Sequence, residues 1–158
     1  MTDPIQNIDH AIHPELLRAY RTAIYVVYGD GGDIVLKTDE LNPDLAALMK
    51  SHGVISAALI TAFNPHSILS TEEDNVRSHN ALIADIHALG LTSLAAEGSD
   101  LSHVWSSEPS ILILGISLAD AESLADRYQQ NAFVWIPADD GFVRLNLRHP
   151  VGSSIVEN

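Results

Sequence analysis

Runs of β-branched, aromatic and aliphatic residues, bounded by Gly, Pro, Asn and Asp, predict the strands of this chain. They cover residues 22–28, 34–37, 54–63, 91–96, 110–116, 132–136 and 142–147. The run SILILGI at 110–116 shows no polar alternation, which is typical of a fully buried central strand. Turns rich in Gly and Asp at 29–33 and 139–141 predict a hairpin near each end of the chain.

Hydrophobic positions at helical spacing, together with capping residues, predict helices between these strands. A short helix is expected over 14–20, and a second begins at Asn42-Pro43 and ends at Gly53. The main helix is expected to start at a Ser70 or Thr71 cap and to run to Gly90. Ser117 is expected to cap the last helix.

The order of these elements favours an α+β class over a doubly wound parallel sheet, which needs strict alternation of strand and helix. We predict a single mixed or largely antiparallel sheet with three main helices packed mostly on one face. The chain is expected to divide into a flexible N-terminal segment (1–13), a single α+β domain (14–149) and a flexible C-terminal tail (150–158).

Composition agrees with one globular domain, since 46% of the 158 residues are hydrophobic and 18% are charged. No apolar run approaches about 18 residues, so no membrane span is expected. The first ten residues lack the cationic start and apolar middle of a signal peptide. The absence of cysteine excludes disulfides and fits a reducing compartment, so we predict a cytoplasmic protein.

The net charge of −13 narrows the range of partners. Such a surface repels phosphate backbones and anionic membranes, so binding to nucleic acid or to a membrane is disfavoured. The charge either serves solubility or forms an acidic face that docks onto a basic partner. The acidic residues are scattered along the chain, which leaves both interpretations open.

The most suggestive polar cluster follows the apolar strand at 54–63. Thr61, Asn64 and Ser67 lie at its end, and Asn75 and Arg77 lie at the start of the main helix. Asn and Ser before a helix commonly satisfy backbone groups within turns. The alternative is a ligand site at the polar end of a buried strand, facing the amino end of a helix. Both interpretations stay open from the sequence.

Arg77 is one of the eight basic residues and sits about one turn into an acidic helix start. It can pair with Glu73 or Asp74 across the helix surface, an interaction worth a few tenths of a kcal/mol. The alternative is a bidentate contact with a carboxylate or phosphate ligand.

A second group of candidates lies far along the chain. Glu108 precedes the buried strand and follows Trp105, so apolar surroundings could raise its pKa and make it an acid or base. Gln130 and Asn131 either end the last helix or read the edge of a ligand with their amides. Trp105 either packs in the core or stacks on a ligand. The histidines show no metal-ligand spacing, so no metal is predicted, and no cofactor motif occurs.

Three segments together resemble a bacterial family described as domain of unknown function 3293. They are ITAFNPHS with the following EEDNVR, then WSSEPSILILGI, then QNAFVW. The resemblance extends from about Tyr20 to Leu147 and implies a compact bacterial domain without implying an activity. The matching positions are Thr61, Asn64, Pro65, Ser67, Asn75, Arg77, Trp105, Glu108, Ser110, Gly115, Gln130, Asn131 and Trp135.

Three functions remain open at this point. The first is a binding or regulatory module whose polar patch holds a small ligand or a peptide. The second is a small enzyme of hydrolase or transferase type, with Glu108 as acid or base and Arg77 as electrostatic clamp. The third is an acidic interaction or inhibitor protein for a basic partner. The first two require that Glu108 and its distant partners meet in one place.

Overall fold

A computed structural model describes residues 11–99 and 107–152 of the chain. Its elements are α2 (Pro14–Thr22), β1 (Ile24–Gly29), β2 (Gly32–Leu36), α3 (Pro43–Ser51), β3 (Ala57–Ile60), η1 (Pro65–Ser67), α4 (Glu72–Ala88), β4 (Thr92–Ser99), β5 (Glu108–Leu114), α5 (Leu118–Arg127), β6 (Ala132–Ile136) and β7 (Arg144–Leu147). The order of the predicted helices and strands is reproduced, with the short 3-10 helix η1 in addition.

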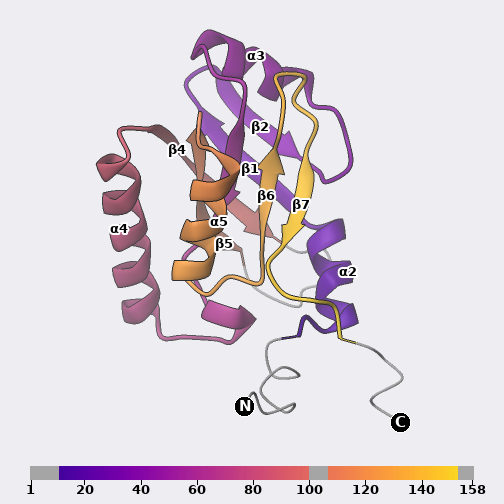
Figure 1. Cartoon of the computed structure of the whole chain (residues 1–158), viewed down its shortest axis with the longest axis vertical. Helices are drawn as coiled ribbons and strands as arrows, with labels where there is room; N and C mark the ends of the chain where they lie inside the picture. The colour runs from indigo at the N-terminus through magenta and orange to yellow at the C-terminus, as the bar shows by residue number, and fades with distance from the viewer. Residues whose placement is uncertain (1–10, 100–106, 153–158) are drawn as a thin grey trace.

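The strands form a single seven-stranded sheet in the order β2-β1-β4-β5-β3-β6-β7 (Figure 1). Every pairing between neighbouring strands is antiparallel. The α+β class is therefore confirmed, and of the two predicted sheet types the antiparallel one is correct. The hairpins β1–β2 and β6–β7 form the two edges of the sheet.

The central strands are buried on both faces of the sheet. In β3, Ala57 and Leu59 pack into one hydrophobic cluster, and Ala58 and Ile60 pack into a second. Successive side chains of a strand point to opposite faces, so each cluster belongs to one face. All four residues of β3 are buried, which requires covering elements on both sides of the sheet.

Helices provide this cover on both faces, and the predicted packing of three main helices mostly on one face is not what the structure shows. Leu82 and Ile86 of α4, together with α5, belong to the cluster that contains Ala58. Leu45 and Met49 of α3 belong to the opposite cluster. Figure 1 shows α4 and α5 side by side and α3 at one end of the sheet, with α2 near the other end. The described residues contain four α-helices.

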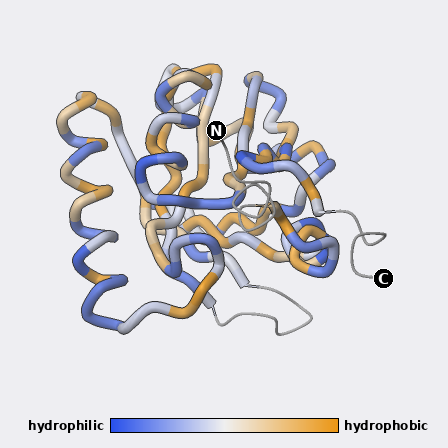
Figure 2. Tube along the Cα trace, turned by 60° about the horizontal axis from the view of Figure 1, so that its bottom comes forward, coloured by the Kyte–Doolittle hydropathy of each residue, from blue (hydrophilic) through white to orange (hydrophobic). Residues whose placement is uncertain are grey.

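The predicted capping residues start the helices as expected. Asn42 Oδ1 accepts a hydrogen bond from the Leu45 N–H at 3.0 Å, and Thr71 and Ser117 cap α4 and α5 in the same way. These side chains satisfy backbone N–H groups that lack a partner within the helix. Along α4, at the left of Figure 2, hydrophobic and hydrophilic positions alternate, so one side of the helix faces the sheet.

Several strand boundaries differ from the predictions by one to three residues. The strand predicted over 54–63 is shorter, Ala57–Ile60, whereas β4 continues past residue 96 to Ser99 and β5 starts earlier, at Glu108. The strand predicted over 91–96 ends before Gly98, which the structure places within β4. A Cβ at Gly98 would stand 3.1 Å from the Tyr25 ring, so the ring packs closely over this glycine.

The ends of the described chain also meet. Ile12 is fully buried, and its N–H donates to the Pro150 carbonyl at 2.8 Å, while its own carbonyl accepts from Gly152 N–H. Ile12 and Val151 thereby form an isolated parallel bridge. Among the residues described, no helix has the length and apolar character needed to cross a bilayer.

Candidate functional site

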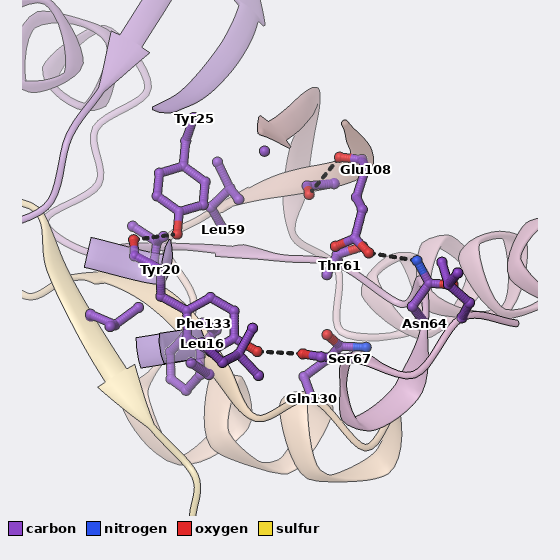
Figure 3. A pocket seen from close by; sticks show the side chains of 16 residues that line it. Leu16, Tyr20, Tyr25, Leu59, Thr61, Asn64, Ser67, Glu108, Gln130 and Phe133 are labelled. Atoms are coloured by element: carbon purple, nitrogen blue, oxygen red, sulfur yellow. Dashed lines mark hydrogen bonds between the residues drawn. The ribbon is translucent and has the colours of Figure 1, made fainter. Parts of the chain in front are cut away.

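A cavity of about 320 Å³ lies on the α3 face of the sheet, at the end where α2 crosses it. Leu16 and Tyr20 of α2 form one wall, and the floor includes Tyr25, Leu59 and Val134 of the sheet. The remaining lining residues come from the segment after β3, the connection between α5 and β6, and the strands β4, β5, β6 and β7. They are Thr61, Asn64, Ser67, Leu69, Gly98, Glu108, Ser110, Gln130, Ala132, Phe133 and Leu145. The polar side chains gather at one end, and the aromatic rings lie on the other (Figure 3).

Glu108, the first residue of β5, is the acidic group of this cavity. Burial raises the pKa of its carboxyl from 4.5 to about 7, and a hydrogen bond from Asn64 opposes part of that rise. Asn64 Nδ2 donates to Glu108 Oε2 at 2.7 Å. Among the described residues that line the cavity, no Lys, Arg or His is present to offset the charge. Glu108 can therefore hold or release a proton near neutral pH.

Asn64 is held in place by a reciprocal pair of hydrogen bonds with Asn75, a buried residue of the first turns of α4. Asn75 Nδ2 donates to Asn64 Oδ1, and Asn64 N–H donates to Asn75 Oδ1, both at 2.9 Å. The Ser70 N–H also donates to Asn64 Oδ1 at 2.9 Å. Because the amide oxygen already accepts two bonds, the amide nitrogen must face Glu108. Asn75 thus orients Asn64, and Asn64 orients Glu108.

The turn that carries these groups has an unusual backbone. Asn64, His66 and Ser67 all have positive φ angles, of 48°, 57° and 61°. Asn tolerates the left-handed region, but each such residue costs on the order of 1 kcal/mol relative to ordinary backbone. Strained residues of this kind cluster at functional sites when surrounding contacts hold them in place. The contacts here come from both α4 and α5.

The end of α5 supplies the contacts that position Gln130. The Gln129 N–H donates to Asp126 and the Gln130 N–H donates to Ala125, which is the Schellman arrangement with Gln129 at φ 56°. This places the Gln130 side chain toward the cavity, where Nε2 donates to the carbonyls of Phe63 and Tyr128 at 3.0 and 3.1 Å. Both amide hydrogens are used, and Gln130 Oε1 accepts no hydrogen bond from the described residues.

Ser67 and Asn131 connect this turn to α2. The Tyr20 and Ser67 hydroxyl oxygens are 2.5 Å apart, and Asn131 Nδ2 donates to Ser67 Oγ at 3.2 Å. Asn131 itself is buried, and its Nδ2 also donates to Tyr20 at 3.4 Å. Desolvation raises the pKa of Tyr20, so its hydroxyl stays protonated at neutral pH. Asn131 therefore supports the cavity wall from behind rather than lining the cavity.

Tyr25 and Gly98, which form the aromatic wall of the cavity, were not predicted as site residues from the sequence. Tyr25, Gly98 and Glu108 are directly opposite one another on β1, β4 and β5, so they form one row across the sheet. The Tyr25 ring lies over Gly98, next to Glu108, and its hydroxyl donates to the Tyr20 carbonyl at 3.2 Å. Burial, as the main cause, raises the Tyr25 pKa. Strand register decides this row, and no local sequence signal encodes it.

The predicted site residues separate into three groups. Asn64, Ser67, Glu108, Gln130 and Thr61 line the cavity, although the Thr61 hydroxyl is already bonded to the Pro109 carbonyl and the Phe63 N–H.

Asn75 and Asn131 lie behind the cavity wall, bonded to residues that line it. Arg77 lies elsewhere: its guanidinium pairs with Glu73 and Asp74 on the exposed side of α4, at 3.3 and 3.0 Å. Its side chain is 68% exposed, so pairing across the helix surface is the interpretation of Arg77 that fits the geometry. Trp105 lies outside the described residues.

Fold and site together define a small antiparallel α+β domain with a partly open cavity that is apolar at one end and carries a carboxyl at the other. A family model described as a protein of unknown function (DUF3293) matches residues 60–133. Over these residues the match confirms the resemblance drawn from the sequence segments. No curated protein and no solved structure matches the chain.

The matched segment contains Thr61, Asn64, Ser67, Glu108 and Gln130, whereas the walls formed by α2, β1 and β7 lie outside it.

Proposed function

We propose that this chain is a small-molecule-binding domain whose ligand occupies the cavity between α2 and the sheet. The observation that carries the proposal is the convergence of Asn64, Glu108 and Gln130, from separate parts of the chain, on one cavity. A volume of about 320 Å³ suits a metabolite-sized molecule rather than a peptide. Mostly apolar walls with a few oriented polar groups are typical of such sites.

The cost of building the site supports a binding role. A buried carboxyl and three left-handed non-glycine residues within one turn are each unfavourable for folding alone. They are held by dedicated contacts, including the Asn64–Asn75 pair and the bond from Gln130 to Phe63. Groups that destabilise a fold yet are held firmly are expected where a ligand uses them.

A metabolite screen by thermal shift tests this proposal on the full chain. Ala132 lines the cavity, so Ala132→Phe is expected to fill part of it and to remove the shift produced by a true ligand. Arg77→Ala is the matched control, because Arg77 lies on the exposed side of α4 and should leave the shift unchanged. A screen without any shift, or shifts that survive Ala132→Phe, would contradict binding in this cavity.

A second candidate is catalysis with Glu108 as general acid or base. The observation in its favour is a carboxyl that titrates near neutral pH inside a cavity, as this chemistry requires. In this form the enzyme uses no clamp from Arg77. Glu108→Gln is expected to lower kcat roughly 10²–10⁴-fold for any substrate that is turned over. Full activity of that variant would rule out this role for Glu108.

A further inference from the structure

The chemical character of the cavity limits which ligands can fill it, if the proposed binding function is correct. Its ionisable lining residues are Glu108 from β5, Tyr20 from α2 and Tyr25 from β1. Both tyrosines have raised pKa values, so Glu108 is the group that carries charge in the neutral range. Within the part of the chain that the structure describes, the lining contains no cationic side chain that could pair with an anionic ligand.

The polar atoms of the cavity that remain available for hydrogen bonds to a ligand are mostly acceptor oxygens. Glu108 Oε2 accepts from Asn64, but Oε1 accepts no hydrogen bond from the described residues, and the same holds for Gln130 Oε1. The amide hydrogens of Gln130 are both donated to backbone carbonyls. A ligand that satisfies these two oxygens must therefore supply donors.

The end of the cavity away from Glu108 suits the apolar or aromatic part of a ligand. Tyr20 and Tyr25 line it together with the aliphatic side chains of Leu16 and Leu59 (Figure 3). Aromatic faces also attract organic cations through their quadrupole. Within the described residues, no group of three or more His, Asp or Glu side chains is arranged to hold a metal ion. The charge that Glu108 could neutralise therefore belongs to an organic group.

We infer that the ligand of this cavity is an organic cation, a protonated amine or amidine attached to an apolar or aromatic body. Its N–H groups would donate to Glu108 and Gln130, while its body would lie against Tyr20, Tyr25 and Leu59. The field of a chain with a net charge of −13 also raises the local concentration of cations. Binding pairs the carboxylate of Glu108, so the cation favours the ionised form of this residue.

Three probes with one aromatic body and different charge test the inference: phenethylamine, phenethyl alcohol and phenylacetate. Each is titrated into the isotope-labelled full chain, and the amide resonances of the cavity residues Gly98, Ser110 and Ala132 report occupancy. Phenethylamine is expected to bind about tenfold or more tightly than the alcohol and the acid. Its affinity should rise as pH increases through about 7, because Glu108 then loses its proton without assistance.

Two variants separate the effect of the Glu108 charge on ligand affinity from the effect of the cavity's shape. Glu108→Gln keeps the shape and removes the charge, so it should lower phenethylamine affinity about tenfold, abolish its pH dependence and leave the alcohol unaffected. Arg77→Ala should change none of these affinities.

Equal or tighter binding of phenylacetate or of the alcohol at these resonances would overturn the cation preference and leave the binding function standing. If no probe moves the cavity resonances, the cation inference is overturned, and the metabolite screen with Ala132→Phe decides the binding function separately.

Discussion

Glu108 shows how one buried group can carry an energetic cost for the whole domain. The unfolded chain releases the carboxyl proton near pH 4.5, whereas the folded chain holds it to about pH 7. Between these values the folded state binds more protons than the unfolded state. Stability from this group is therefore present below pH 4.5 and is lost as pH rises through 7.

We predict that Glu108→Gln removes this loss. The wild-type free energy of unfolding should fall by on the order of 1–3 kcal/mol between about pH 4.5 and 7, and the variant should lack that component. Urea unfolding at a series of pH values measures both curves. Arg77→Ala serves as the control and should keep the wild-type slope. Parallel curves for wild type and Glu108→Gln would mean that Glu108 titrates normally in the folded protein.

Asn64 is predicted to limit the proton affinity of Glu108. Its Nδ2 donates to the carboxylate and lowers the pKa of Glu108 against the larger effect of burial. Asn64→Ala removes that donor, so the Glu108 pKa should rise above 7 while the protein loses about 1–3 kcal/mol of stability. An NMR titration of the Glu108 carboxyl checks the direction, and an unchanged or lower pKa would show that Asn64 does not act on the carboxyl.

At the scale of elements, the polar end of the cavity is formed by turns and helix ends rather than by helix bodies. The turn at 64–67 and the end of α5 are tied together by the bond from His66 N–H to the Gln129 carbonyl, at 2.7 Å, and by the bond from Gln130 to Phe63. These connections bring the polar end of β3 next to the polar exit of α5. The helices themselves mainly cover the sheet.

Gln129 offers a test of how α5 ends. It occupies the left-handed position of a Schellman ending, where glycine is favoured, and its side chain is exposed. Gln129→Gly is predicted to stabilise the domain by about 0.5–1 kcal/mol in urea unfolding, because the strain of a side chain at positive φ disappears. Gln129→Ala keeps that strain and should not stabilise. A destabilised glycine variant would contradict the assigned helix ending.

Gly98 offers a matching test of the aromatic wall. A Cβ at this position would lie 3.1–3.2 Å from two atoms of the Tyr25 ring, so Gly98→Ala must displace the ring. We predict a loss of about 1–3 kcal/mol in stability and weaker binding of any cavity ligand. Gly31→Ala is the control, because its Cβ would meet no atom within 4 Å. Equal effects of the two substitutions would show that the ring does not rest on Gly98.

For the whole molecule, local signals predicted the elements well and long-range placement poorly. Caps at Asn42 and Ser117 depend on hydrogen bonds within a few residues, so the sequence reveals them. The position of the helices on both faces depends on tertiary packing. The apolar run at 111–114 already pointed to it, since a strand buried on both sides needs cover on both.

The residues of the candidate site also divide into those that local sequence signals reveal and those that only long-range placement brings to the site. Asn64, Glu108 and Gln130 were singled out in the sequence as amide and carboxyl groups near the ends of apolar strands, and they meet in the structure. Tyr25 and Gly98 were missed because register across three strands brings them to Glu108. Arg77 was included because an isolated basic residue looks functional, but neighbouring acids on its own helix account for it.

The most direct test of the proposed site is an NMR titration of the Glu108 carboxyl in the free full chain and in the presence of phenethylamine. We predict a midpoint near pH 7 in the free protein, because burial disfavours the carboxylate, and a lower midpoint with the amine bound, because the cation pairs with it. A midpoint near 4.5 that phenethylamine does not move would contradict both the buried carboxyl and its role as the ligand-binding group.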